Sequence, residues 1–223
     1  MRKKLLLPAL SRFALGLILV SLLLFLPAGT TDWPWGQRFL VLLFLPMLLA
    51  GIVMLVKSPA LLEKRLSVRE KEGEQKRVIG FSGLLFVIVF VLAGLNRRFL
   101  WLPLPEWLSW AASALFLLAY LLFAEVLREN SYLSRTVEVQ EGQKIIDTGL
   151  YGLVRHPMYS ASVLLFLSMP LILGSLPSFL LMLLYLPLIV KRIRNEEEVL
   201  EQGLPGYREY KRRVKYRLLP LIW

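Results

Sequence analysis

The chain has 223 residues, of which 57% are hydrophobic, and a formal net charge of +11. Its mean hydropathy is +0.60, and a soluble domain of this size has too little interior to bury so much apolar side chain. There is no cysteine and one histidine, which excludes disulfides, cysteine nucleophiles and multi-histidine metal centres, so we expect no metal site.

Apolar runs of about twenty residues match the thickness of a bilayer and predict membrane-spanning helices. The first run has the length of a signal-peptide core, but residues 26–30 make a poor cleavage site, so an uncleaved anchor is favoured over a cleaved leader. We therefore expect an all-α integral membrane protein of about six transmembrane helices, the last two forming a helical hairpin. The predicted spans are residues 5–26, 37–57, 78–96, 107–128, 159–173 and 177–191.

The basic residues follow the topology of the chain rather than forming a nucleic-acid-binding surface. With the N-terminus in the cytoplasm, only Arg38, Arg97 and Arg98 of the 27 basic residues fall in outside segments. This positive-inside bias predicts that both termini are cytoplasmic. We expect the lipid bilayer as a partner, with contacts to anionic headgroups, and no nucleic acid. The sequence gives no indication of the oligomeric state.

Two regions are predicted along the chain. Residues 1–128 form an N-terminal transmembrane region of four helices, whose cytoplasmic loop 58–77 is expected to hold an interfacial helix followed by solvated residues. Residues 129–223 form a second region with a different character. Its loop alternates like a strand at 136–139, can turn at Glu141-Gly142 and can return at 144–146, which predicts a small cytoplasmic hairpin.

The end of the chain contains two helix breaks that determine which segments meet. Gly174-Ser-Leu-Pro177 separates the last two apolar runs, so we expect them to form a tight helical hairpin. This hairpin would bring Arg155–Tyr159 and Arg192–Glu198 to the same membrane face. After a second break at 203–206, Tyr207–Lys215 is predicted to be a short basic interfacial helix, followed by an apolar tail able to fold back as a lid.

The segment Arg155-His-Pro-Met-Tyr159 has two interpretations. Pro157 favours an extended His156 and suits the first turn of the following helix. Free N–H groups at that helix end, together with Arg155 and His156, would form a site for an anionic group. The alternative is an ordinary helix start with a snorkelling arginine and a histidine among the headgroups.

Acidic residues at the next membrane exit also have two interpretations. Glu196, Glu197 and Glu198 can be a solvated turn neutralised by neighbouring basic residues. Alternatively, one carboxylate faces the helix bundle while its neighbour is paired, which would match a ligand carrying an amine beside a carboxylate. Glu125 is either a functional group at membrane depth or the partner of Arg128 in an interfacial ion pair.

The C-terminal region resembles the isoprenylcysteine carboxyl methyltransferase and phospholipid methyltransferase group of membrane enzymes over about residues 129–223. The order and spacing of several short motifs carry the resemblance. These motifs are Asn130-Ser-Tyr132, Gly142-Gln-Lys144-Ile-Ile146, Gly149-Leu-Tyr151, Arg155-His-Pro-Met-Tyr159, Arg192-x-x-x-Glu196-Glu197-x-x-Leu200, Tyr207-x-x-Tyr210 and Pro220. The chain departs from the family at 203–206 and at Ser160-Ala161.

The resemblance implies S-adenosylmethionine as cofactor and a lipophilic methyl acceptor with a carboxylate, thiol or amine. It implies that Arg192 orients the acid pair or faces the acceptor, and it makes Arg192 and Glu197 the catalytic candidates. The cofactor-binding residues carried over by motif position are Gly149, Tyr151, Arg155, His156, Pro157, Tyr159, Glu196 and Glu197.

Two other functions are compatible with parts of the sequence. An NADPH-dependent lipid reductase similar to the steroid 5α-reductases would share the Arg-His-Pro-x-Tyr segment, but this chain continues with Ser160-Ala161 where those enzymes differ. A non-enzymatic membrane subunit or small transporter would explain the apolar runs and the charge bias. It would leave the clustering of ionisable residues at two converging helix ends without a purpose.

Overall fold

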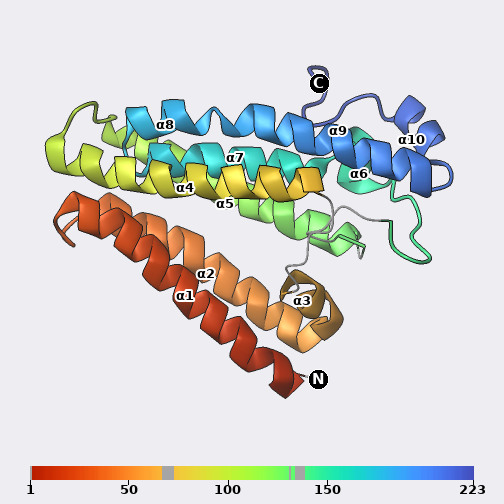
Figure 1. Cartoon of the computed structure of the whole chain (residues 1–223), viewed down its shortest axis with the longest axis horizontal. Coiled ribbons are helices and arrows are strands. Elements are labelled where there is room, and N and C mark those ends of the chain that lie inside the picture. The colour runs from red at the N-terminus through yellow and green to blue at the C-terminus, as the bar shows by residue number, and fades with distance from the viewer. Residues whose placement is uncertain (1, 67–72, 131, 134–138) are drawn as a thin grey trace.

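The computed structural model describes residues 2–66, 73–130, 132–133 and 139–223 (Figure 1). Within these ranges the chain is helical and contains no extended strand, which confirms the all-α prediction. The helices are α1 (Arg2–Ala28), α2 (Pro34–Lys57), α3 (Pro59–Leu66), α4 (Gly73–Phe99), α5 (Glu106–Glu129), α6 (Gly149–Leu153), α7 (Pro157–Ile172), α8 (Leu176–Met182), α9 (Tyr185–Gly203) and α10 (Tyr207–Arg213).

Long apolar helices make this an integral multi-pass membrane protein. Five segments are long and apolar enough to cross a bilayer, namely Leu5–Ala28, Pro34–Lys57, Lys76–Phe99, Glu106–Glu129 and Leu176–Gly203. The apolar helix α7 is shorter, at 16 residues or about 24 Å. The six crossings and the cytoplasmic termini remain predictions.

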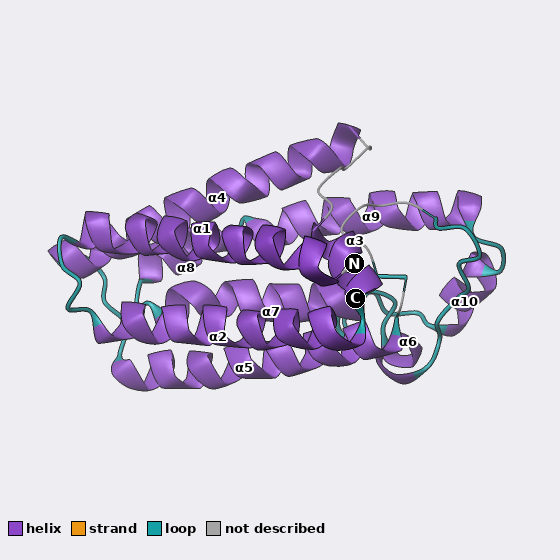
Figure 2. Cartoon of the chain, turned by 90° about the horizontal axis from the view of Figure 1, so that it is seen from below, coloured by secondary structure: helices purple, strands orange, loops and turns teal. Residues whose placement is uncertain are grey.

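The helices pack in two layers around an apolar core. Figure 1 shows α8 and α9 running end to end beside α4 and α7, while α1 and α2 diverge from them as a pair. In the view from below, α2, α5 and α7 lie along one side of the molecule (Figure 2). Leu24, Phe39, Phe116 and Ile172 are fully buried where these helices meet. The small helices α6 and α10 gather at the far end of α9, where they frame the candidate site.

The predicted hairpin of the last two apolar runs is present, and its turn depends on a glycine. Gly174 has φ +70°, and a Cβ there would lie 1.9 Å from the Trp35 ring. The turn continues into Ser175, whose hydroxyl caps α8 by accepting a hydrogen bond from the Ser178 N–H. The Ser178 hydroxyl in turn donates to the Val89 carbonyl at 3.1 Å. The turn is therefore tied to α4.

The second arm of the hairpin differs from its prediction, which placed it at residues 177–191. The arm is divided into α8 and α9, and α9 continues to Gly203. Pro187 explains the division, because a proline ring clashes with the carbonyl four residues earlier and has no N–H to donate. Charge does not end the helix, since Lys, Arg and Glu are good helix formers. The acidic residues therefore lie on a continuous helix rather than in a turn.

The cytoplasmic segments are confirmed in part. Helices α3 and α10 are present where short helices were expected, although α10 ends at Arg213 instead of Lys215. The chain turns at Gly142 (φ +69°), where the Gln143 N–H donates to the Gln140 carbonyl at 3.0 Å. Residues 144–146 form no strand, so the predicted return strand is absent. The solvated segment 67–72 and the outgoing limb 136–138 lie outside the described residues.

Gly174→Ala should destabilise the protein, because the added methyl group meets the Trp35 ring and the backbone conformation is unfavourable for alanine. We expect a loss on the order of 1–3 kcal/mol in the free energy of unfolding, seen as a lower midpoint of thermal unfolding in detergent. Gly51→Ala is the matched control, since a Cβ there meets nothing within 4 Å. A midpoint unchanged by Gly174→Ala would contradict this account of the turn.

Candidate functional site

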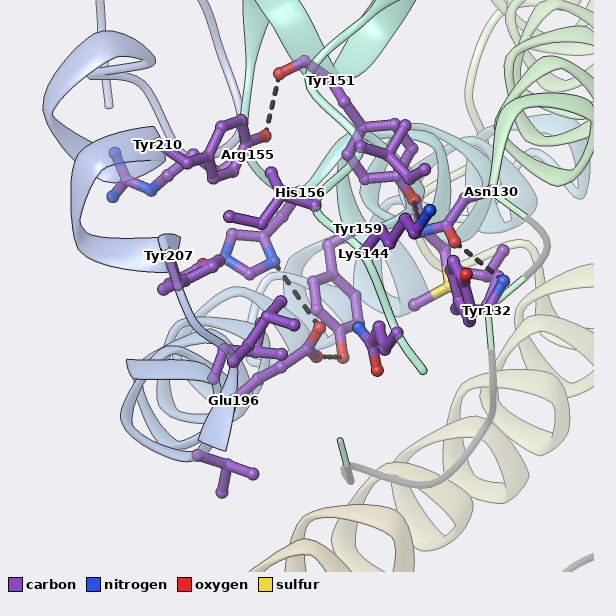
Figure 3. A pocket seen from close by; sticks show the side chains of 18 of the residues that line it. Asn130, Tyr132, Lys144, Tyr151, Arg155, His156, Tyr159, Glu196, Tyr207 and Tyr210 are labelled. Carbon is purple, nitrogen blue, oxygen red and sulfur yellow. Dashed lines mark hydrogen bonds and ion pairs between the residues drawn. The ribbon is translucent and has the colours of Figure 1, made fainter. Parts of the chain in front are cut away.

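The two motifs predicted to converge line one cavity at the end of the bundle (Figure 3). The cavity lies between the end of α5, the loop before α6, the start of α7, the last turns of α9, and α10. Its volume is about 870 Å³ when the open mouth and the solvent space in it are included. Asn130, Tyr151, His156, Glu196 and Tyr207 are among the residues on its wall.

Arg155 and His156 have non-helical backbone and are paired with the tail of the chain. His156 is the N-cap of α7 with φ −126°, and Pro157 occupies the first turn. The backbone N–H groups of Arg155 and His156 each donate at 2.9 Å, to the carbonyls of Tyr216 and Arg217 respectively. The tail thus lies alongside the motif, and proline makes this possible by keeping the preceding residue out of the helix.

The N–H groups of Arg155 and His156 are therefore engaged with the tail and are not available to an anionic ligand. The guanidinium of Arg155 is also engaged, because its Nη1 donates to the carbonyls of Val214 and Lys215 at 2.8 Å each. Its Nε donates to Glu197. Arg155 lines the cavity, yet these donors are directed at the protein. Its main effect is to hold the tail in place.

Glu197 is the centre of a buried charge network. The residue is 2% exposed. One carboxylate oxygen, Oε1, lies 2.7 Å from Arg155 Nε and 3.3 Å from His156 Nε2. The other, Oε2, lies 2.9 Å from Arg217 Nη2 and 3.7 Å from Lys211 Nζ. Burying a carboxylate is costly unless charged partners compensate it, and here cations from three segments do so.

Glu196 has the opposite placement, on the wall of the cavity. Its side chain is 24% exposed, and it accepts a hydrogen bond from the Tyr159 hydroxyl. Arg192 Nε donates to the same hydroxyl at 2.9 Å, and His156 Nδ1 lies 3.9 Å from Glu196 Oε1. His156 therefore lies between the two carboxylates, of which Glu196 lines the cavity and Glu197 lies behind it. This separation follows from the helix, because consecutive residues point about 100° apart.

Gly149, expected to shape the cofactor pocket, has a structural position instead. Its φ is +50°, and a Cβ would lie 1.5 Å from Glu129 Oε1. The Glu129 carboxylate accepts a hydrogen bond from the Leu150 N–H at 3.1 Å, at the start of α6. Gly149 lets the carboxylate of α5 approach α6, and it is not among the residues that line the cavity.

Tyr151 does line the cavity, and it connects three segments. Its hydroxyl accepts from Asn130 Nδ2 at 2.9 Å, and its carbonyl accepts from the Tyr210 hydroxyl at 2.8 Å. Pro157 acts through the backbone, as described above. Glu125 forms a bidentate pair with Arg128 at 2.5 and 2.8 Å on an exposed part of α5, which agrees with the ion-pair interpretation.

Several residues of the site were missed by the sequence interpretation. Lys211 and Arg217 were counted only as topology charges, although both contact Glu197. Tyr207 and Tyr210 were part of the motif resemblance without an assigned role, and both line the cavity. The many basic residues that follow the acidic residues of α9 are the one sequence signal for Lys211 and Arg217. This signal does not distinguish which of the basic side chains turn inward.

Residues 107–205 match the family model described as phospholipid methyltransferase. The match runs from α5 to the break after α9 and confirms the resemblance predicted from the motifs. The matched residues make up less than half of the chain. The match begins before residue 129, and the predicted division of the chain at that residue stays a prediction.

Two individual proteins are similar to this chain. The solved structure of the eukaryotic intramembrane Ras methyltransferase, an isoprenylcysteine carboxyl methyltransferase, matches with a TM-score of 0.50 and 15% identity over 97% of this chain and 85% of that one. This likeness concerns the fold. A Delta(14)-sterol reductase of Mus musculus is 31% identical over 91 residues, which are 40% of this chain and 22% of the reductase. The chain therefore matches less than a quarter of that relative's length.

Glu197→Gln should destabilise the fold, because it leaves the buried Arg155 guanidinium without a negative partner. Breaking a buried ion pair from one side costs on the order of 3 kcal/mol, which would lower the midpoint of thermal unfolding in detergent. The exposed neighbour offers a matched control, Glu198→Gln, for which we expect no change. Equal midpoints for the two variants would show that Glu197 has no such role.

Proposed function

We propose, from the match to the phospholipid methyltransferase model and the lining of the cavity, that the protein transfers a methyl group from S-adenosylmethionine to a lipophilic acceptor at the cytoplasmic membrane face. The observation that carries the proposal is the carboxylate of Glu196 on the cavity wall. Among the described residues that line the cavity, it is the only acidic one, while His156, Arg192 and Lys144 line the same space. A carboxylate in the same cavity as the cations of Arg192 and Lys144 suits the ammonium and carboxylate groups of a methionine moiety.

The rest of the lining also fits this cofactor. Tyr151 and Tyr207 provide aromatic surfaces for an adenine ring, and such rings attract a cationic sulfonium. Met158 and Leu204 add apolar surface to the same cavity. When bound, S-adenosylmethionine supplies an electrophilic methyl group on a sulfonium. The residues present are therefore compatible with the group that the family implies.

The protein contributes orientation rather than covalent chemistry. Tyr159 and His156 hold Glu196 in one direction, so that its carboxylate meets the ammonium group without reorganisation. Glu197 acts one step further back as a positioning residue, since it holds Arg155 and His156. Displacement at a methyl carbon depends mainly on alignment and on exclusion of water. This suits a cavity whose described lining contains no serine, threonine or cysteine.

Arg192 is the proposed catalytic residue on the acceptor side. Its Nε bond to Tyr159 fixes the guanidinium at the cavity wall, where it would orient the acceptor. A carboxylate or thiolate acceptor needs no general base, and an amine acceptor needs only to be neutral. The lipophilic part of the acceptor would enter from the bilayer. The positive-inside bias predicts that it enters from the cytoplasmic leaflet.

Glu196→Gln should weaken binding of S-adenosylhomocysteine, measured by calorimetry on the detergent-purified full chain. Loss of a charge-assisted hydrogen bond is worth roughly 1.5–3 kcal/mol, or about ten- to a hundredfold in the dissociation constant. Glu198→Gln, on the exposed face of the same helix turn, should bind like the wild type. An unchanged affinity in Glu196→Gln would refute the role of the carboxylate.

Arg192→Lys should lower the rate of labelled-methyl transfer into a lipid extract by about tenfold or more, because lysine keeps the charge but loses the planar Nε donor. We expect the affinity for S-adenosylhomocysteine to change much less than the rate. If the affinity falls as far as the rate, Arg192 serves the cofactor and not the acceptor.

A second function, NADPH-dependent reduction of a lipid, is favoured by the partial match to the sterol reductase. The two functions differ in the cofactor that they require. Titration of the wild-type protein with NADPH and with S-adenosylhomocysteine separates them. Binding of NADPH alone would overturn the methyltransferase proposal.

A further inference from the structure

Tyr207 has the least satisfied hydroxyl on the cavity wall. The residue is 4% exposed, and within the described part of the chain its hydroxyl has no hydrogen-bond partner. Two other tyrosines of the wall differ in this respect. The Tyr210 hydroxyl donates to the Tyr151 carbonyl, and the Tyr159 hydroxyl donates to Glu196. Tyr207 is thus distinguished from chemically identical neighbours by its unused donor.

The side chain of Tyr207 cannot easily turn away to find water. It follows Gly206, whose φ of +82° begins α10, and its ring is packed with Leu204 and Val214. The last turn of α10 is held by two ion pairs. Lys211 contacts Glu197 at 3.7 Å, and Arg213 contacts Asp147 at 2.7 Å. The ring is therefore fixed in the wall beside His156 and above Glu196 (Figure 3).

The chemical state of this hydroxyl is also defined. Burial first, and then the nearby carboxylates of Glu197 and Glu196, raise the pKa of Tyr207 well above its ordinary value. The phenol keeps its proton, so it remains a hydrogen-bond donor at any physiological pH. A buried donor without a partner costs about 1–3 kcal/mol, and such groups are rare in native proteins unless another molecule supplies the acceptor.

We propose that the Tyr207 hydroxyl is a ligand contact, donating a hydrogen bond to an acceptor atom of the bound methyl donor. This proposal rests on the proposed function and gives the hydroxyl of Tyr207, whose ring already lines the cavity, a specific role in binding. The fixed ring, the cavity position and the unused donor together identify a contact that the motifs at 155–159 and 192–197 do not include. The small helix α10 would then contribute to recognition of the cofactor as well as covering it.

Tyr207→Phe removes the hydroxyl and keeps the ring. We expect the dissociation constant for S-adenosylhomocysteine to rise about three- to tenfold, the range for one buried neutral hydrogen bond. Without ligand, the midpoint of thermal unfolding should stay the same or rise, because the variant no longer buries an unpaired donor. The matched control is Tyr210→Phe, which loses a bond within the protein and should have a lower midpoint.

The measurements separate this proposal from the one on which it rests. If the wild-type protein fails to bind S-adenosylhomocysteine, the proposed function itself is overturned before any variant is compared. If the wild type binds and Tyr207→Phe binds equally well, only the role of Tyr207 is overturned. A midpoint lowered in Tyr207→Phe as much as in Tyr210→Phe would also overturn it, because the hydroxyl would then have a structural partner.

Discussion

The buried carboxylate of Glu197 is the interaction on which the site depends. It is contacted by Arg155 and His156 before α7, by Lys211 on α10 and by Arg217 in the tail. Each of these segments is short, and none has an extensive apolar core of its own. The buried Glu197 carboxylate is stable only when its cationic partners are in place, and it therefore holds these three segments together. The geometry of the cavity wall is a consequence of this junction.

Two neighbouring acids have different roles because of where the helix points them. Glu197 is surrounded by cations and is committed to the structure, whereas Glu196 is held by one hydroxyl and lies near one imidazole, and it lines the cavity. In the proposed function, the Glu196 carboxylate would be held by Tyr159 and by His156, which also contacts Glu197, so that little freedom would be lost when a ligand binds.

Much of the architecture was predictable from the sequence, because the signals are strong and local. Apolar length predicted the spanning helices, Gly174 predicted the hairpin turn, and the hairpin predicted that the motifs at 155–159 and 192–198 meet. The division between Glu196 and Glu197 was not predictable, since it depends on the rotation of α9 relative to α7. Nor was the inward turn of Arg217, because a basic residue in a basic tail has no local pattern that separates a structural ion pair from a topology signal.

The pairing of Arg155 and His156 with Tyr216 and Arg217 also constrains the order of events during biosynthesis. The contacts join residues about sixty positions apart, and the two apolar arms lie between them. The helices can insert and associate as they emerge from the ribosome, but the cavity wall stays incomplete until the segment around residue 217 has been translated. The pocket is therefore completed by docking of the tail onto a motif that the hairpin of α7, α8 and α9 has already brought close, so that only the short segment after α9 has to close.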